Sequence, residues 1–151
     1  MRKTLFTLLM LLGVSLMQAA EFNPEAQWIT ASQGEVNQPG TWLAFRQDVK
    51  LGKVPSEVLA NIAADSRYWL WINGKQVVFE GSLKRGPTPQ DSYYDQIDLT
   101  PYLKKGNNQI AVLLWYFGKS GFSHTDSGKS GILLLLLLLS RFCHVRLCAT
   151  P

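Results

Sequence analysis

The chain has 151 residues, enough for one domain with a sizeable core, and its 46% apolar and 17% charged residues exclude an intrinsically disordered protein. The net charge of +4 comes from the two ends, because residues 21–131 contain 11 basic residues and all 11 acidic residues of the chain. This balance excludes a nucleic-acid-binding protein that works through a basic surface.

Residues 1–20 are predicted to be a secretory signal peptide. Arg2 and Lys3 precede an apolar run from Leu5 to Met17, and the small residues Ala19 and Ala20 follow it. An uncleaved membrane anchor is the alternative, but the run is shorter than the roughly 20 residues that span a bilayer. We expect a periplasmic or extracellular protein with no stable membrane span after cleavage.

The following region predicts short antiparallel strands rather than helices. Residues 26–31 read as a first strand, and residues 42–51 alternate apolar side chains with Arg46, Asp48 and Lys50, as in a strand with one wet face. Residues 58–64 alternate in the same way. No helical period separates these segments.

The stretch from Ala63 to Val78 predicts a β-hairpin. Asn73-Gly74 lies between two apolar runs, and this dipeptide readily adopts the two positive φ angles of a type I′ turn. Period-2 alternation places Tyr68, Leu70 and Ile72 on one face and both Trp69 and Trp71 on the other. Such a strand is covered on both sides, or one side is a binding face.

A short helical turn and another strand are predicted after the hairpin. Asp98 or Thr100 can cap the turn, Pro101 suits its first position, and Gly106 can end it. Residues 109–117 then alternate as a strand. Short strands joined by turns at this spacing predict an all-β fold, an antiparallel β-sandwich.

Three motifs in this order carry a family resemblance. They are Trp-Leu-Ala-Phe-Arg at 42–46, Ala-Asp-Ser-Arg-Tyr-Trp-Leu-Trp-Ile-Asn-Gly-Lys at 64–75, and the segment 94–112 that begins Tyr-Asp-Gln-Ile-Asp-Leu. The chain resembles the N-terminal β-sandwich of bacterial α-L-rhamnosidases and, more distantly, the jelly-roll sugar-binding domains of β-galactosidase-like enzymes. The resemblance covers about Ala26 to Gly131 and implies a galactose-binding-like jelly roll that precedes a much larger catalytic domain; we assign this accessory domain to residues 21–131.

No catalytic residue is assigned, because the barrel that carries the family's catalytic acid and base has no counterpart here. Asp91, Asp95 and Asp98 suit turn and capping roles better than a glycosidase pair. Calcium at Asp95 or Asp98 is a minor alternative, so no cofactor or metal ligand is expected. Ser123, His124 and Asp126 are the residue types of a hydrolase triad but share one short loop, whereas triad partners come from separate elements.

Aromatic side chains are the candidate carbohydrate-binding residues, because a flat ring can stack on the C–H face of a pyranose. The candidates are Trp69, Trp71, Trp115 and Tyr116. The competing interpretation is that these rings pack the sandwich, with Trp69 and Trp71 at its packing centre, or face the missing catalytic domain.

The resemblance favours a non-catalytic accessory domain of an exported glycoside hydrolase. Such a domain would support the catalytic domain or substrate approach in the breakdown of plant-type, rhamnose-containing polysaccharides. The alternatives are an independent carbohydrate-binding module and a β-sandwich adhesion or assembly domain.

Residues 132–151 do not continue the pattern of the body. They begin with Ile132 and seven leucines, have neither strand nor helix periodicity, and resemble translated interspersed-repeat sequence of mammalian genomes. We therefore expect a non-native, low-complexity tail and a sandwich that is incomplete at its C-terminal end. Cys143, His144 and Cys148 fall short of the four ligands of a structural zinc site.

Overall fold

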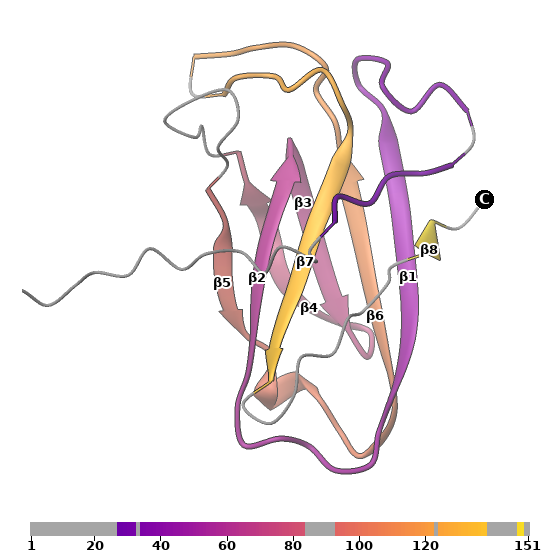
Figure 1. Ribbon diagram of the computed structural model, residues 1–151, viewed down its shortest axis with the longest axis vertical. Helices are drawn as coiled ribbons and strands as arrows, with labels where there is room; N and C mark the ends of the chain where they lie inside the picture. The colour runs from indigo at the N-terminus through magenta and orange to yellow at the C-terminus, as the bar shows by residue number, and fades with distance from the viewer. Residues whose placement is uncertain (1–26, 33, 84–92, 123, 139–147, 150–151) are drawn as a thin grey trace, which may run out of the picture.

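Two antiparallel β-sheets face each other in the computed structural model, which describes residues 27–32, 34–83, 93–122, 124–138 and 148–149 (Figure 1). The predicted signal peptide at 1–20 lies outside the described residues. The elements are β1 (Trp42–Leu51), β2 (Val58–Asp65), β3 (Arg67–Ile72), β4 (Lys75–Ser82), β5 (Asp95–Asp98), the 3₁₀ turn η1 (Thr100–Tyr102), β6 (Gly106–Trp115), β7 (Gly131–Leu138) and β8 (Cys148–Ala149). The predicted β-sandwich is confirmed.

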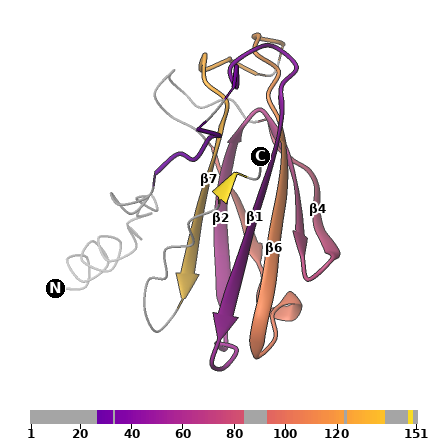
Figure 2. The same cartoon turned by 90° about the vertical axis from the view of Figure 1, so that its right-hand side faces the viewer.

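The larger sheet has the strand order β4-β3-β6-β1-β8, and the smaller sheet has the order β5-β2-β7 (Figure 1). Figure 2 shows β7 beside β2 and β1 beside β6. Strand β6 is the centre of the larger sheet, because it pairs with β1 from Trp42↔Trp115 to Leu51↔Gly106 and with β3 on its other side. In the described residues no helix is long and apolar enough to cross a membrane.

The hydrophobic core is formed by the inward-facing residues of both sheets. Tyr68, Leu70 and Ile72 of β3 are fully buried there, together with Ile62 of β2 and Leu114 of β6. The interpretation of Trp69 and Trp71 as the packing centre is wrong, because the alternation of β3 turns both rings to the other side of the sheet, where they are only partly buried.

The predicted hairpin is confirmed. Asn73 and Gly74 have φ angles of 52° and 80°, the two positive values of a type I′ turn, between β3 and β4. The Asn73 side chain also fixes the turn to its surroundings, because its Nδ2 donates to the Tyr102 carbonyl and to Asn108 Oδ1, both at 2.9 Å.

The predicted helical turn is the 3₁₀ turn η1. Asp98 Oδ1 accepts a hydrogen bond from the Thr100 backbone nitrogen at 2.9 Å, which is the local role expected of this carboxylate. Hydrogen bonds from the Thr100 side chain and from its backbone nitrogen lower the pKa of Asp98. The predicted cap by Asp98 or Thr100 is wrong, because the N-cap residue is Leu99 and no side chain makes a cap hydrogen bond. Thr100 Oγ1 instead accepts from the Val58 backbone nitrogen at 2.8 Å and ties η1 to β2.

The predicted first strand at 26–31 is reduced to a single bridge between Ile29 and Ile132. Their backbones exchange two hydrogen bonds of 2.9 and 3.0 Å. Beyond this pair a side-chain contact replaces the ladder, because Thr30 Oγ1 lies 3.1 Å from Ser130 Oγ.

Strand β7 crosses the boundary expected at residue 131. It pairs with β2 from Asp65↔Gly131 to Val58↔Leu138, and Ile132 and Leu134 join the core. The leucine run is therefore a sandwich strand as far as Leu138. The foreign origin expected for 132–151 remains a prediction.

Candidate functional site

Large aromatic side chains gather on the outer side of the larger sheet. We call Trp42, Trp69, Trp71, Phe79 and Trp115 the aromatic face. In β1, β3 and β6 the residues that alternate with the core residues point outward, and the register brings them into rows across the sheet. One row is Arg67, Trp115 and Trp42; the row two residues further along is Trp69, Leu113 and Ala44.

Four rings of the aromatic face, those of Trp42, Trp69, Trp115 and Phe79, form a chain of contacts. The Trp42 ring stacks on Trp115, with centroids 4.9 Å apart and planes inclined by 7°, and on Trp69, at 5.4 Å and 29°. Phe79 of β4 packs edge-on against Trp69 at 6.3 Å. Trp42 is 49% exposed and Phe79 is 70% exposed, so the cluster reaches the surface.

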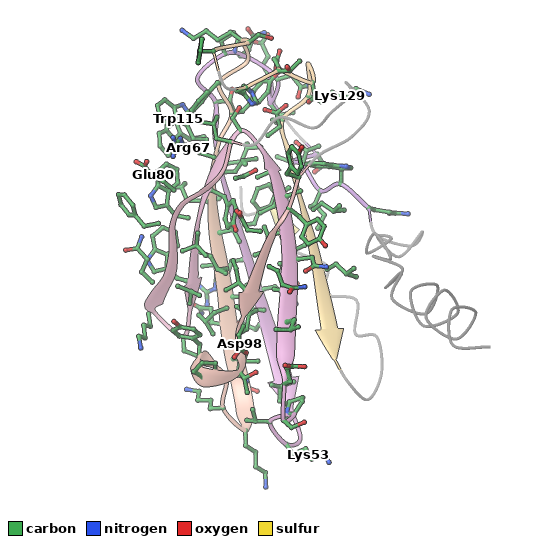
Figure 3. All side chains as sticks on the ribbon, turned by 90° about the vertical axis from the view of Figure 1, so that its left-hand side faces the viewer. Lys53, Arg67, Glu80, Asp98, Trp115 and Lys129 are labelled. Atoms are coloured by element: carbon green, nitrogen blue, oxygen red, sulfur yellow. The ribbon has the colours of Figure 1, made fainter. Side chains whose placement is uncertain are left out.

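An ion pair borders the aromatic face. The Arg67 Nη1 atom donates to Glu80 Oε2 at 2.9 Å, and Figure 3 shows Arg67, Glu80 and Trp115 on the same side of the sandwich. Both side chains are partly exposed. The upper part of this surface thus combines stacked rings with one neutralised charge pair.

Polar side chains adjoin the aromatic face at Trp71. The register places Ala111 beside Trp71 and Arg46 beyond Ala111. With its amide oxygen toward Arg46, Gln109 accepts hydrogen bonds from the Arg46 Nη2 and Nε atoms at 2.7 and 3.1 Å. The small Ala111 separates the Trp71 ring from this Arg46–Gln109 pair. A ring with polar groups alongside is the composition of a sugar subsite.

The structure separates the four predicted carbohydrate-binding residues. Trp69 and Trp115 lie in the stacked cluster, and Trp71 lies on the same face beside Ala111. Tyr116 lies elsewhere and is only 1% exposed. Burial, a hydrogen bond to Asp126 and the charges of Asp126 and Asp65 raise the pKa of Tyr116, which keeps its hydroxyl protonated.

Sequence reasoning missed Trp42 and Phe79. The signal for Trp42 was present, because it has the same parity in its strand as the outward-facing Arg46, Asp48 and Lys50. Phe79 was harder to assign, because β3 and β4 pair with register shifts between Tyr68 and Trp71 that break simple alternation.

Asp95 and Asp98 have hydrogen-bond partners within the sandwich. Asp95 Oδ2 accepts hydrogen bonds from the Tyr68 hydroxyl at 3.1 Å and the Ser82 backbone nitrogen at 2.7 Å. Asp98 lies on the opposite end of the sandwich from Lys129 (Figure 3). His124 and Asp126 are close to Asp65, while Asp91 and Ser123 lie outside the described residues.

Comparison with solved structures connects this fold to glycosidases. A GH78 family rhamnosidase of Bacillus sp. GL1 is 32% identical with a TM-score of 0.70, and the match covers 82% of this chain and 13% of that chain. An α-L-rhamnosidase from Aspergillus terreus is 23% identical with a TM-score of 0.57, over 76% of this chain and 14% of that chain. The chain thus spans about an eighth of the length of these enzymes.

The sandwich architecture also occurs in a lectin. The Pleurotus ostreatus lectin in complex with GalNAc is 14% identical with a TM-score of 0.53, and the match covers 87% of this chain and 37% of the lectin. At this identity the likeness concerns the fold alone. No family model and no curated protein sequence matches the chain.

Proposed function

We propose that this chain is the non-catalytic accessory β-sandwich of an exported α-L-rhamnosidase-like glycoside hydrolase. The observation that carries the proposal is the 32% identity to a GH78 family rhamnosidase over most of this chain and only 13% of that enzyme. A domain of this size beside a much larger remainder fits a supporting role. The signal-peptide pattern at 1–20 supports export.

The aromatic face is the surface we assign to this role. Contiguous exposed apolar side chains on a small domain mark interaction sites more often than single exposed residues do. Each stacked ring uses at least one of its two faces for a neighbouring ring. Fewer ring faces are then left for sugars, so the cluster of Trp42, Trp69 and Trp115 suits packing against the catalytic domain.

Carbohydrate binding is the second candidate function, and the surroundings of Trp71 favour it. This ring lies beside Ala111 and the hydrogen-bonded pair Arg46–Gln109. A pyranose on Trp71 would place its hydroxyl groups near a guanidinium and an amide, both of which bind hydroxyls well.

Three measurements test the proposal on the 151-residue chain and its gene. We expect no hydrolysis of an aryl α-L-rhamnoside by the 151-residue chain. We expect the genomic DNA after codon 132 to encode a catalytic region, and we expect the longer protein that contains this region to hydrolyse the same rhamnoside. Hydrolysis of the rhamnoside by the 151-residue chain would overturn the accessory role. So would genomic sequence that continues past codon 132 without an open reading frame for a catalytic region.

Calorimetric titration with rhamnose-containing oligosaccharides decides the second function. If the module exists, saturable binding is lost in Trp71→Ala and retained in Trp28→Ala, a matched change of a tryptophan that is half-exposed but outside the aromatic face. If the unmodified chain binds none of these oligosaccharides, the carbohydrate-binding function is rejected and the supporting role remains.

A further inference from the structure

A second group of functional side chains lies between the end of β2 and the segment that joins β6 to β7. Asp65, His124 and Asp126 each offer a ligand atom, and these atoms all lie within 4.8 Å of one another. Asp65 and His124 are 6% exposed, and Asp126 is partly buried. Clusters of this kind on an exposed surface are common, but burial makes this one costly without a counter-charge.

The hydrogen bonds of the cluster satisfy Asp65, whereas Asp126, which is hydrogen-bonded to Tyr116, keeps one oxygen without a partner. His124 Nε2 lies 3.1 Å from Asp65 Oδ1 and 3.3 Å from Ser66 Oγ, and Ser66 Oγ donates to Asp65 Oδ1 at 2.7 Å. Asp65 Oδ2 accepts from the Ser127 backbone nitrogen at 2.9 Å. Asp126 Oδ1 is buried and has no hydrogen-bond partner among the described residues.

This arrangement is not a hydrolase triad. In a triad the carboxylate holds one ring nitrogen of the histidine while the serine hydroxyl contacts the other. Here Asp65 and Ser66 both contact Nε2 of His124, so the imidazole cannot relay a proton from serine toward that carboxylate.

We propose that Asp65, His124 and Asp126 form a binding site for a divalent transition-metal ion, with Zn²⁺ as its ligand. The unpaired, buried Asp126 Oδ1 is the observation that points to a ligand, because a buried carboxylate oxygen without a partner is destabilising. One imidazole with two carboxylates is a donor set that zinc accepts, whereas calcium takes oxygen ligands. Three protein ligands leave a fourth position for water or a further ligand.

The local charge supports a cation. Two carboxylates, those of Asp65 and Asp126, lie within the cluster. A divalent ion would balance these two charges, and it would tie the β6–β7 segment to the end of β2.

The site is also connected to the aromatic face. The Phe117 ring lies 5.9 Å from the His124 ring and 4.6 Å from Trp115, edge-on in both cases. Metal binding would therefore fix the aromatic residues nearest the site.

The test is calorimetric titration of the EDTA-treated 151-residue chain with Zn²⁺, with Ca²⁺ and Mg²⁺ in separate runs. We expect one Zn²⁺ per chain and a Tm increase of roughly 5–10 °C when free Zn²⁺ exceeds the Kd about 100-fold. Asp126→Asn should weaken binding by at least about tenfold, since it removes a charged ligand. Asp48→Asn, an exposed carboxylate outside the cluster, is the matched control.

A second variant separates this site from the thiols near the C-terminus. Cys143→Ser/Cys148→Ser should bind Zn²⁺ unchanged, and X-ray absorption of the zinc complex of the unmodified chain should show nitrogen and oxygen ligands without sulfur. The proposal is overturned by any of three results: no zinc binding tighter than about 100 μM, sulfur in the first shell, or equal binding by Asp126→Asn and the unmodified chain.

Discussion

Tyr68 shows how a single side chain can join the two sheets. Its ring is buried in β3 of the larger sheet, while its hydroxyl donates to Asp95 of β5 in the smaller sheet. Asp95 also accepts from the Ser82 backbone nitrogen of β4. One carboxylate therefore connects three strands, which explains why a polar atom is tolerated at the edge of the core.

Replacing Tyr68 with phenylalanine should lower the free energy of unfolding by about 1.5–3 kcal/mol, the usual cost of losing a hydrogen bond to a charged group. Urea denaturation at pH 7 measures the loss. Tyr102→Phe, at a partly buried position in η1, is the control and should have little effect. Equal stability of Tyr68→Phe and the unmodified chain would show that the Tyr68–Asp95 bond contributes nothing.

The same residue predicts a pH dependence. Burial, followed by the charge of Asp95 and the hydrogen bond to it, raises the pKa of Tyr68 above its unfolded value of about 10. Its stabilising contribution is fully present below that pH. Above it the unfolded chain loses the proton while the folded chain retains it, so stability falls. Tm should therefore decline above pH 10 more steeply in the unmodified chain than in Tyr68→Phe.

At the scale of elements, β3 and β7 differ in how their register is determined. In β3 every second residue is apolar and buried, so a slip by one residue would move Leu70 and Ile72 out of the core. Strand β7 contains leucine at each position after Ile132, so a slip by one residue places one leucine where another leucine was. Its register depends on its start, where Ile29 pairs with Ile132 and Asn37 Oδ1 accepts from the Ser130 backbone nitrogen at 2.7 Å.

This difference predicts unequal effects of insertion. One extra leucine after Leu135 should cost less than about 1 kcal/mol, because the strand presents the same side chains to β2. One extra alanine after Trp69 should cost more than about 3 kcal/mol, because it turns the following core residues outward. Thermal unfolding of the two variants measures the contrast. Similar Tm values would show that β7 has a unique register of its own.

Local patterns predicted much of these elements and little of the contacts between them. Asn73-Gly74 identified the hairpin, and period-2 alternation separated Tyr68 from Trp69. The contact between Asp65 and His124 joins residues 59 positions apart, and no local periodicity encodes it. The stacking of Trp42 on Trp115 likewise depends on the pairing of β1 with β6, which the sequence pattern leaves open.

For the whole molecule, β7 completes the smaller sheet. It is the partner of β2 along the full length of that strand, and it adds Ile132 and Leu134 to the core. A leucine run can take this place because it supplies apolar side chains to both faces of the strand. Sequence reasoning assigned the leucines to a foreign tail, since a run of one residue type has no periodicity that would show which side chains face the core.

A chain that ends at Ser130 should lose its cooperative unfolding transition. Removing β7 exposes the edge of β2 and takes away two core residues, each contributing about 1.5–3 kcal/mol. A chain that ends at Leu138 is the control and should retain the transition. Calorimetry compares the two, and a sharp transition in the shorter chain would show that β7 is dispensable.

Strand β7 also has a consequence for behaviour at high concentration. It is the last strand of its sheet, and in the described part of the chain only Ile29 pairs with its outer edge. A uniform leucine strand with open backbone groups accepts an identical strand from another molecule in any alignment. The strand that closes the sandwich is therefore also the place where separate molecules would polymerise, so the soluble lifetime of the protein should shorten as its concentration rises.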